Sequence, residues 1–316
     1  MFNFLARRFF SSIISVIGAT LAIFVLIQFH NDPRELFVPD SGYGISQEQW
    51  EALGDRLGLN DPLWKQYVDW VGRTLRGDLG VSLARDRAVT ELLRGKIGAT
   101  VQLAIGSWVF AIALGIPMGV LAAVKRGSGW DYFGRGLAIV GQAAPPFVTA
   151  LVAIWIFAVW LEWLPAGGRS PEFNWKEYIL PCTALGWGAA ASLMRLTRSS
   201  MLEVLDSEYI RLARAKGVNW NWVIYKHALR NALIVPVTSA LLTFSGWLNG
   251  ALVVEIVFSW PGIGYEALYR AVNDNDFPLL LGTVFIFILI YLVFATIADI
   301  AYTIIDPRVR LGDSSE

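Results

Sequence analysis

The chain has 316 residues, of which 55% are hydrophobic and 16% are charged, and its formal net charge is zero. Because the apolar residues come in long runs, this is the composition of a membrane protein, and the neutral balance gives no sign of a nucleic-acid partner. The single cysteine, Cys182, excludes an internal disulfide framework, and the presence of only two histidines argues against a multi-histidine metal site.

The N-terminus predicts a retained first membrane span. Arg7 and Arg8 precede an uncharged run over residues 9–29 that is long enough to cross a bilayer, and no small-residue cleavage site follows it. Five further uncharged runs cover residues 100–124, 136–161, 178–194, 231–254 and 277–298. The sequence therefore predicts an all-α membrane protein with six transmembrane helices.

The distribution of lysine and arginine predicts the orientation, because these residues gather on the cytoplasmic side of membrane spans. With the N-terminus inside, the cytoplasmic side holds Arg7, Arg8, Lys125, Arg126, Arg135, a basic loop before the fifth span, Arg308 and Arg310. Both termini are therefore expected in the cytoplasm. The expected parts are a tail and first helix (1–30), an external segment (31–98), a five-helix core (99–306) with a cytoplasmic coupling loop (195–232), and a cytoplasmic tail (307–316).

The external segment is too long to be a mere connection. Residues 62–76 have an amphipathic helical pattern that ends at Gly77-Asp78-Leu79-Gly80, and residues 46–49 resemble a capping pattern for another short helix. A solvated lid on the membrane domain and a docking surface for an external partner are both compatible with this pattern.

Prolines and acids inside or beside the expected spans allow two interpretations. Pro117, Pro145-Pro146 and Pro181 free backbone carbonyls, and we interpret them as ordinary kinks, with the lining of a polar pathway as the alternative. Glu255 and Asp299 lie near span ends, so we expect boundary residues that reach the interface and assign no proton relay.

A basic segment at residues 206–236 predicts a cytoplasmic helix-turn-helix between the fourth and fifth spans. Its basic residues are Arg211, Arg214, Lys216, Lys226, His227 and Arg230, with Arg198 just upstream. Apolar residues recur between them at helical spacing, and Gly217-Val218-Asn219 has the composition of a turn. A basic patch that binds anionic lipid is the alternative interpretation.

The motifs of several chemistries are absent from the sequence. It contains no G-x-x-x-x-G-K-[ST] phosphate loop, no H-E-x-x-H and no Cys/His cluster. We therefore expect no catalytic residue and no metal site in this chain, which leaves a transport pathway whose motor is another chain.

The basic segment carries a family resemblance. Residues 209–217 (YIRLARAKG) and 227–234 (HALRNALI) closely resemble the ATPase-contacting loop of ABC-importer permeases of the dipeptide/oligopeptide/nickel type. Landmarks that resemble this family continue along essentially the whole chain: Gly77-Asp78-Leu79-Gly80 with Ser82-Leu83, Ala99-Thr100, Leu103-Ala104, Gly115-Ile116-Pro117, Leu164-Pro165-Ala166-Gly167-Gly168, Val254-Glu255, Phe258-Ser259-Trp260-Pro261-Gly262 and Asp306-Pro307-Arg308. The long external segment resembles that of the first of the two permease subunits.

The resemblance implies the partners and the cellular place. It implies a second permease subunit, two ATPase subunits that hold ATP and Mg, an external substrate-binding protein and surrounding lipid, in the plasma (inner) membrane of a bacterium or archaeon. No cofactor is expected in this chain. The implied cargo is short peptides moved by alternating access, with nickel chelates, glutathione or oligosaccharides as alternatives. A self-contained secondary transporter and a membrane scaffold are the alternatives from other classes.

The resemblance also implies site residues. The residues expected to couple to the ATPase are Glu208, Tyr209, Arg211, Leu212, Ala213, Arg214, Ala215, Lys216 and Gly217. Small Ala213 and Ala215 would permit close approach, the three basic residues would meet polar rim groups, and Gly217 would make the turn. Arg211-Leu212-Ala213 stands where importers in general have Glu-Ala-Ala, which puts in doubt the contact made by that glutamate. Trp260, Pro261 and Gly262 are expected at an external gate or on the binding-protein side.

Overall fold

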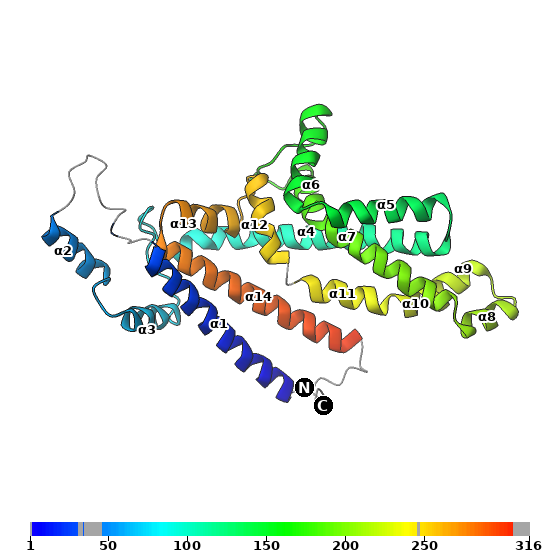
Figure 1. Cartoon of the computed structure of the whole chain (residues 1–316), viewed down its shortest axis with the longest axis horizontal. Coiled ribbons are helices and arrows are strands. Elements are labelled where there is room, and N and C mark those ends of the chain that lie inside the picture. The colour runs from blue at the N-terminus through cyan, green and yellow to red at the C-terminus, as the bar shows by residue number, and fades with distance from the viewer. Residues whose placement is uncertain (1, 31–33, 35–45, 245–246, 306–316) are drawn as a thin grey trace. The chain divides into compact units, whose positions relative to one another are not determined.

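The computed structural model describes residues 2–30, 34, 46–244 and 247–305 (Figure 1). The expected residues Arg308 and Arg310 and the landmark at 306–308 lie outside this part. The described chain is helical, with one isolated β-bridge between Val81 and Ala88. Its α-helices are α1 (Phe2–His30), α2 (Gln47–Leu57), α3 (Leu63–Thr74), α4 (Val89–Val124), α5 (Gly129–Ala143), α6 (Pro146–Ala153), α7 (Trp175–Leu205), α8 (Glu208–Ala215), α9 (Trp220–Trp222), α10 (Leu229–Ala232), α11 (Ile234–Phe244), α12 (Trp247–Val257), α13 (Arg270–Asn273) and α14 (Phe277–Ile305). Wider π-helical turns form η2 (Ile154–Trp160), η3 (Val223–Ala228) and η4 (Gly264–Tyr269).

The chain divides into two compact units. One comprises residues 1–99 and 262–292, and the other comprises residues 100–261 and 293–316. We call them the first and the second unit and describe each by itself.

In the first unit, the described part of the 31–98 segment packs against neighbouring helices through buried apolar side chains. The two expected short helices are confirmed as α2 and α3, and a capping box between Ser46 and Gln49 begins α2. Phe24 of α1, Trp70 of α3 and Leu281 of α14 form one buried cluster. A second cluster joins Leu79 to the first turns of α4 and to η4. Helix α3 therefore buries Trp70 against α1 and α14. The choice between a solvated lid and a docking surface stays a prediction.

In the second unit, α4 and α7 approach so closely that only glycine fits at several contacts. A Cβ atom on Gly115 would lie 2.6 Å from the carbonyl oxygen of Ala190, and one on Gly186 would lie 2.6 Å from that of Ser107. Gly119 approaches Met194 in the same way. The small residues of α7 therefore serve close packing against α4.

The helices bear out a membrane protein but only part of the expected span pattern. Within the described residues, three helical segments are long and apolar enough to cross a bilayer: α4, α7 and residues Phe277–Ala301 of α14. The bent pair of α5 with residues 146–160 would make a fourth if it forms one span. The run at 231–254 is divided among α10, α11 and α12, with residues 245–246 outside the described part. The count of six spans therefore stays a prediction.

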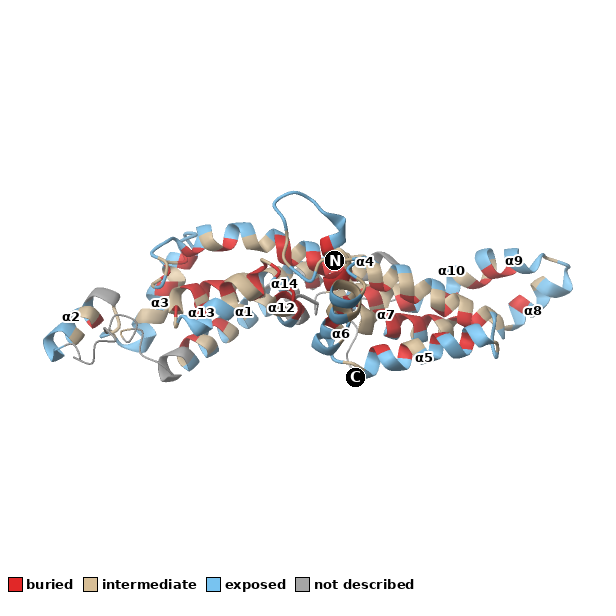
Figure 2. Cartoon of the chain, turned by 90° about the horizontal axis from the view of Figure 1, so that it is seen from above, coloured by how far each residue is buried: buried red, intermediate tan, exposed pale blue. Residues whose placement is uncertain are grey.

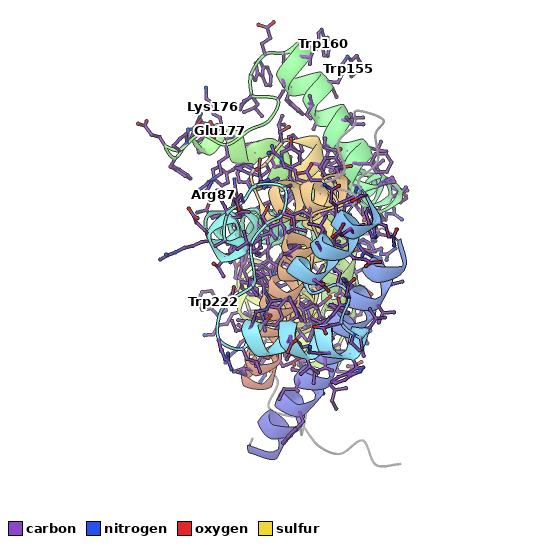
Figure 3. The ribbon with its side chains drawn as sticks, turned by 90° about the vertical axis from the view of Figure 1, so that its left-hand side faces the viewer. Arg87, Trp155, Trp160, Lys176, Glu177 and Trp222 are labelled. Carbon is purple, nitrogen blue, oxygen red and sulfur yellow. The ribbon has the colours of Figure 1, made fainter. Side chains whose placement is uncertain are left out.

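Within the expected third span, residues 136–161, the helix is broken at the prolines where a kink was expected. Helix α5 ends at Ala143, and the segment Pro146–Trp160 leaves it at an angle of 112°. The cause is Pro145-Pro146, because the residue before a proline is pushed into extended backbone and a proline offers no N–H to continue the helix. Ala144 has φ −88° and ψ 122°, and Pro145 is also extended. Along η2, Trp155 and Trp160 then point away from the ribbon (Figure 3).

Candidate functional site

Helix α8 and the segments after it form the expected helix-turn-helix. Ser207 precedes α8, which ends at Lys216, and Gly217 follows with φ +76°. This backbone conformation favours glycine, because other L-residues clash there. Asn219 then begins the next helical segment by accepting a hydrogen bond from Asn221 N at 3.0 Å. The predicted turn at 217–219 is confirmed.

A buried apolar cluster, which we call the seat, fixes α8 to its own chain. Ile210 is only 1% exposed and packs with Met201 of α7, Ala123 of α4, and Val223 and Ile224 of η3. Because the seat joins the ends of two long helices, α8 has little freedom to move independently of them.

The structure gives Ala213 a contact within its own chain, and its expected contact with an ATPase stays a prediction. This residue is half-buried and packs against the seat, since it lies one helical turn after Ile210 on the same face of α8. Its small size therefore serves contact within the chain, whereas Ala215 is exposed. The expected coupling residues at the surface are Glu208, Tyr209, Arg211, Leu212, Arg214, Ala215, Lys216 and Gly217, and Figure 2 shows exposed residues along α8.

Polar contacts shape this exposed face. Arg211 Nη1 lies 2.8 Å from Glu208 Oε1, and the guanidinium of Arg214 lies 5.1 Å from the ring centre of Trp220. Tyr209 OH accepts a hydrogen bond from Asn231 Nδ2 at 3.0 Å, which links α8 to α10. Leu212 is 61% exposed at the centre of this face. On this face, the apolar side chain of Leu212 therefore lies among charged side chains, and Arg211 and Arg214 are held by contacts with neighbouring residues.

A buried ion pair that was not predicted from the sequence holds the adjoining loop. Asp131 is 1% exposed and accepts two hydrogen bonds from Arg198 of α7, at 2.7 and 3.0 Å. Gly127 N donates to the same carboxylate at 3.0 Å, and Arg135 Nε lies 3.4 Å away. The available signal was a single acid among the basic residues that follow α4.

The expected external residues do not form one exposed surface. Trp260 is fully buried in the second unit, where its ring lies edge-on to Tyr178 at 4.9 Å. Gly168 N donates to the carbonyl of Phe258 at 2.7 Å, and a Cβ on Gly167 would lie 2.3 Å from that oxygen. Trp260 is therefore wrong as a contact for an external protein, because its side chain is covered by its own unit. Pro261 is half-buried, and Gly262, which is buried, belongs to the first unit. A part for these residues in a gate stays a prediction.

Glu255 is also not the interfacial residue that was expected. Its side chain is 0% exposed, and its carboxylate accepts a hydrogen bond from Thr100 Oγ1 at 2.6 Å. A buried acid bound by a hydroxyl is a structural link between α12 and α4 within the second unit. Asp299, by contrast, is half-buried.

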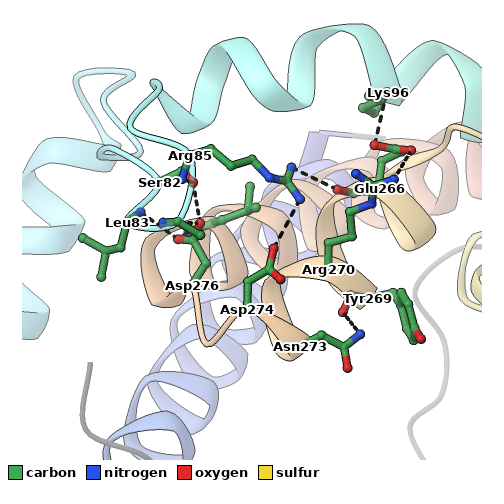
Figure 4. Close-up of polar contacts among 12 residues, drawn as sticks. Ser82, Leu83, Arg85, Lys96, Glu266, Tyr269, Arg270, Asn273, Asp274 and Asp276 are labelled. Carbon is green, nitrogen blue, oxygen red and sulfur yellow. Dashed lines mark hydrogen bonds and ion pairs between the residues drawn. The ribbon is translucent and has the colours of Figure 1, made fainter. Parts of the chain in front are cut away.

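In the first unit, Asp276 ties the loop after Gly80 to the start of α14 (Figure 4). Its buried carboxylate accepts hydrogen bonds from Ser82 Oγ, from Leu83 N at 3.2 Å and from Leu279 N at 3.3 Å. Arg85 extends the contact to Asp274 at 3.6 Å. The sequence signal was an aspartate directly before an apolar run. This is a helix-start pattern, but the contact was not predicted from it.

Comparisons with known proteins agree with this architecture. Residues 115–311 match the family described as binding-protein-dependent transport system inner membrane component, and residues 1–104 match its N-terminal family. The dipeptide transport system permease protein DppB of Alkalihalophilus pseudofirmus is 37% identical over 336 residues, which cover 98% of this chain and 100% of that protein. The glutathione transport system permease protein GsiC of Escherichia coli K12 is 34% identical over 98% of this chain and 99% of its own length.

Solved structures show the same fold at low sequence identity. The MetNI methionine ABC transporter, in an inward-facing conformation, has a chain that matches with a TM-score of 0.57 and 18% identity, over 68% of this chain and 96% of that chain. An amino acid ABC transporter crystallised with histidines matches with a TM-score of 0.50 and 16% identity, over 67% and 94%. The fold is thus that of ABC-transporter membrane chains, and family membership implies a multi-pass inner membrane protein that works with ATPase subunits and a binding protein. The chain belongs to the family of binding-protein-dependent transport system inner membrane components and is a transmembrane permease subunit of an ABC importer.

Proposed function

We propose that this permease moves short peptides, delivered by an external substrate-binding protein, into the cytoplasm by alternating access. It works with a second permease subunit and with two ATPase subunits that bind ATP and Mg, and both of its termini face the cytoplasm. The full-length similarity to permeases named for dipeptide and glutathione transport supports this cargo, since both names refer to small peptides. Nickel chelates and oligosaccharides are the competing cargoes.

The observation that carries the coupling role is the two-sided character of α8. One side is fixed in the seat through Ile210 and Ala213, and the other side presents Leu212 with charged neighbours. An exposed apolar residue in a charged rim is the composition of a protein interface. In the proposed mechanism this face lies in a groove of one ATPase subunit, with Arg214 and Lys216 near the rim.

Transmission of movement follows from the seat. When ATP closes the two ATPase subunits, each pulls on its α8, and the buried contacts of Ile210 pass the displacement to α7 and α4. Packed helices then shift as rigid bodies, because a close-packed interface does not deform continuously. The inward-open pathway is thereby converted to an outward-open one.

The test replaces Leu212 with aspartate in the complex reconstituted with its partners. Because Leu212 is exposed in this chain, Leu212→Asp should leave the permease folded while desolvation of the new carboxylate prevents ATPase docking. Peptide-stimulated ATP hydrolysis should fall to the basal rate. The matched control is Asn221→Asp, which adds the same charge at an exposed position of α9.

Two outcomes would contradict the proposal. Normal peptide stimulation of ATP hydrolysis in the Leu212→Asp complex would show that α8 does not make the coupling contact. It would favour the lipid-binding interpretation of the basic loop. In the wild-type complex, ATP hydrolysis that responds to nickel chelates or sugars but to no peptide would contradict the proposed peptide cargo. The proposed coupling role of α8 would be unaffected. A scaffold would give no substrate-stimulated turnover at all.

A further inference from the structure

The break between α5 and α6 opens a hollow inside the second unit, which is mostly apolar and carries a few polar groups. The hollow has a volume of about 470 Å³, which is within the usual range of small-ligand sites. In Figure 1, α6 stands across α5 where the two helices meet beside α7. The lining comes from residues 141–146 and Thr149 on one side, and from α7 between Ala184 and Ser192 on the other.

Two backbone carbonyl groups at this break cannot accept the usual helical hydrogen bond from the residue four positions later. In a continuous helix, the carbonyls of Gly141 and Gln142 would accept from the N–H groups of residues 145 and 146. Both of those residues are proline, which has no N–H. Broken backbone at membrane depth is tolerated where it is buried in protein or lines a water-filled cavity. The hollow beside Gly141 and Gln142 is such a cavity.

Polar side chains face the same hollow. Gln142 Nε2 donates to Ser192 Oγ at 3.3 Å, which leaves the amide oxygen of Gln142 and the hydroxyl proton of Ser192 for a ligand. Thr149 Oγ1 donates to the carbonyl of Pro146 at 2.8 Å. Gln142 and Ser192 are both exposed although they belong to apolar helices, and an exposed polar group there requires water or a polar ligand.

The chemistry of the lining selects a class of ligand. It is rich in hydrogen-bond acceptors and contains no Asp, Glu, Lys, Arg or His. Because α5 ends here, its C-terminal carbonyls also add a partial negative charge. Such a surface suits N–H donors and an ammonium group, and it has no side chain suited to grip a metal chelate.

We propose that this hollow is a transit site in the pathway, where the backbone N–H groups and terminal ammonium of a passing peptide bind to Gln142, Ser192 and the carbonyls of the break. This inference rests on the proposed function, since it assumes a peptide cargo. A neutral site binds weakly, and weak binding allows the cargo to leave on the next conformational change.

The experiment measures thiol accessibility in the assembled, reconstituted complex. Cys182 is buried and is the only cysteine of this chain, so a Cys182→Ala background makes an introduced thiol unique in the permease chain, which is separated from its partners before its labelling is measured. Ser192→Cys places the thiol in the hollow, and Leu151→Cys is the control, because Leu151 is exposed on α6 but is not part of the lining. The probe is a charged methanethiosulfonate ethylammonium reagent, with and without dialanine.

We expect Ser192→Cys to react roughly tenfold faster than Leu151→Cys, because thiolate formation requires water and a charged reagent does not enter lipid. Dialanine should slow the reaction at Ser192→Cys several-fold. Equal rates at the two positions would overturn the transit site even if peptides drive ATP hydrolysis. Fast reaction without protection, in a complex that peptides do not stimulate, would overturn the peptide cargo and thus the proposed function. Fast reaction without protection, in a complex that peptides do stimulate, would overturn peptide binding at this hollow alone.

Discussion

Replacement of Arg198 by alanine should destabilise the second unit strongly. Arg198 donates two hydrogen bonds to Asp131, and the Asp131 side chain is 2% exposed while that of Arg198 is 21% exposed. Removal of the guanidinium leaves a buried carboxylate with Gly127 N and the more distant Arg135. The cost arises from the unpaired buried charge rather than from the loss of an attraction in water.

The magnitude follows from the burial of the pair. Breaking a buried pair by removing one partner costs about 3–5 kcal/mol, and the partial exposure of Arg198 favours the lower end, about 3 kcal/mol. For a unit of about 150–250 residues, each kcal/mol lowers the melting temperature by about 2–4 °C. Arg198→Ala should therefore melt roughly 6–12 °C below the parent protein.

Cys182 supplies the assay, since it is buried in the same unit and reacts with a thiol-specific fluorescent dye only when that unit opens. The control is Arg126→Ala, because Arg126 pairs with Asp206 at 3.6 Å with both side chains exposed, and exposed pairs contribute about 0–1 kcal/mol. Equal melting temperatures for Arg198→Ala and Arg126→Ala would refute this prediction. The double variant Asp131→Ala/Arg198→Ala should recover part of the loss, since no buried charge remains.

Three further outcomes are expected. Ser82→Ala should weaken the link between the loop after Gly80 and α14 by about 1.5–3 kcal/mol, because a buried carboxylate loses a charge-assisted hydrogen bond, and faster hydrogen exchange at residues 82–85 and 276–280 would report it. Gly217→Val should reduce peptide-stimulated ATP hydrolysis, because φ +76° costs a β-branched residue about 1–2 kcal/mol or more, whereas Gly217→Asn should retain it. Gly167→Ala should lower the thermal stability measured through Cys182, since the new Cβ would meet the Phe258 carbonyl at 2.3 Å.

The sequence predicts the helix-turn-helix well because its residues have a clear amphipathic pattern. Polar and apolar residues then alternate with the helical period, so the buried face of Val223, Ile224 and Ala228 can be read directly. The sequence could not assign the contact of Ala213, because a small residue suits contact with its own chain and with a partner equally well. Ala213 contacts its own chain because it lies on the same face of α8 as the buried Ile210.

The membrane helices were less predictable because an apolar run has no polar face to orient it. Pro145-Pro146 marked a place where a helix could kink, but the sequence could not distinguish a kink from the 112° break that the structure contains. Pro117 and Pro181, which stand alone, lie inside the continuous helices α4 and α7. The difference is physical: two adjacent prolines remove two successive helical hydrogen bonds, whereas one proline removes a single bond.

Helix α7 connects the parts of the second unit that the proposed mechanism requires to move together. It carries Ser192 at the hollow, Arg198 at the buried ion pair and Met201 in the seat of α8. From Ser192 to Leu205 it spans about 20 Å at 1.5 Å per residue, so a tilt of about 10° would displace one end by roughly 3–4 Å relative to the other. Gly119 contacts the backbone of α7 at Met194, between the two ends, and Gly115 contacts it at Ala190, beside the hollow. Such contacts resist separation but allow rotation, and they therefore suit a pivot through which work done at α8 reaches the hollow.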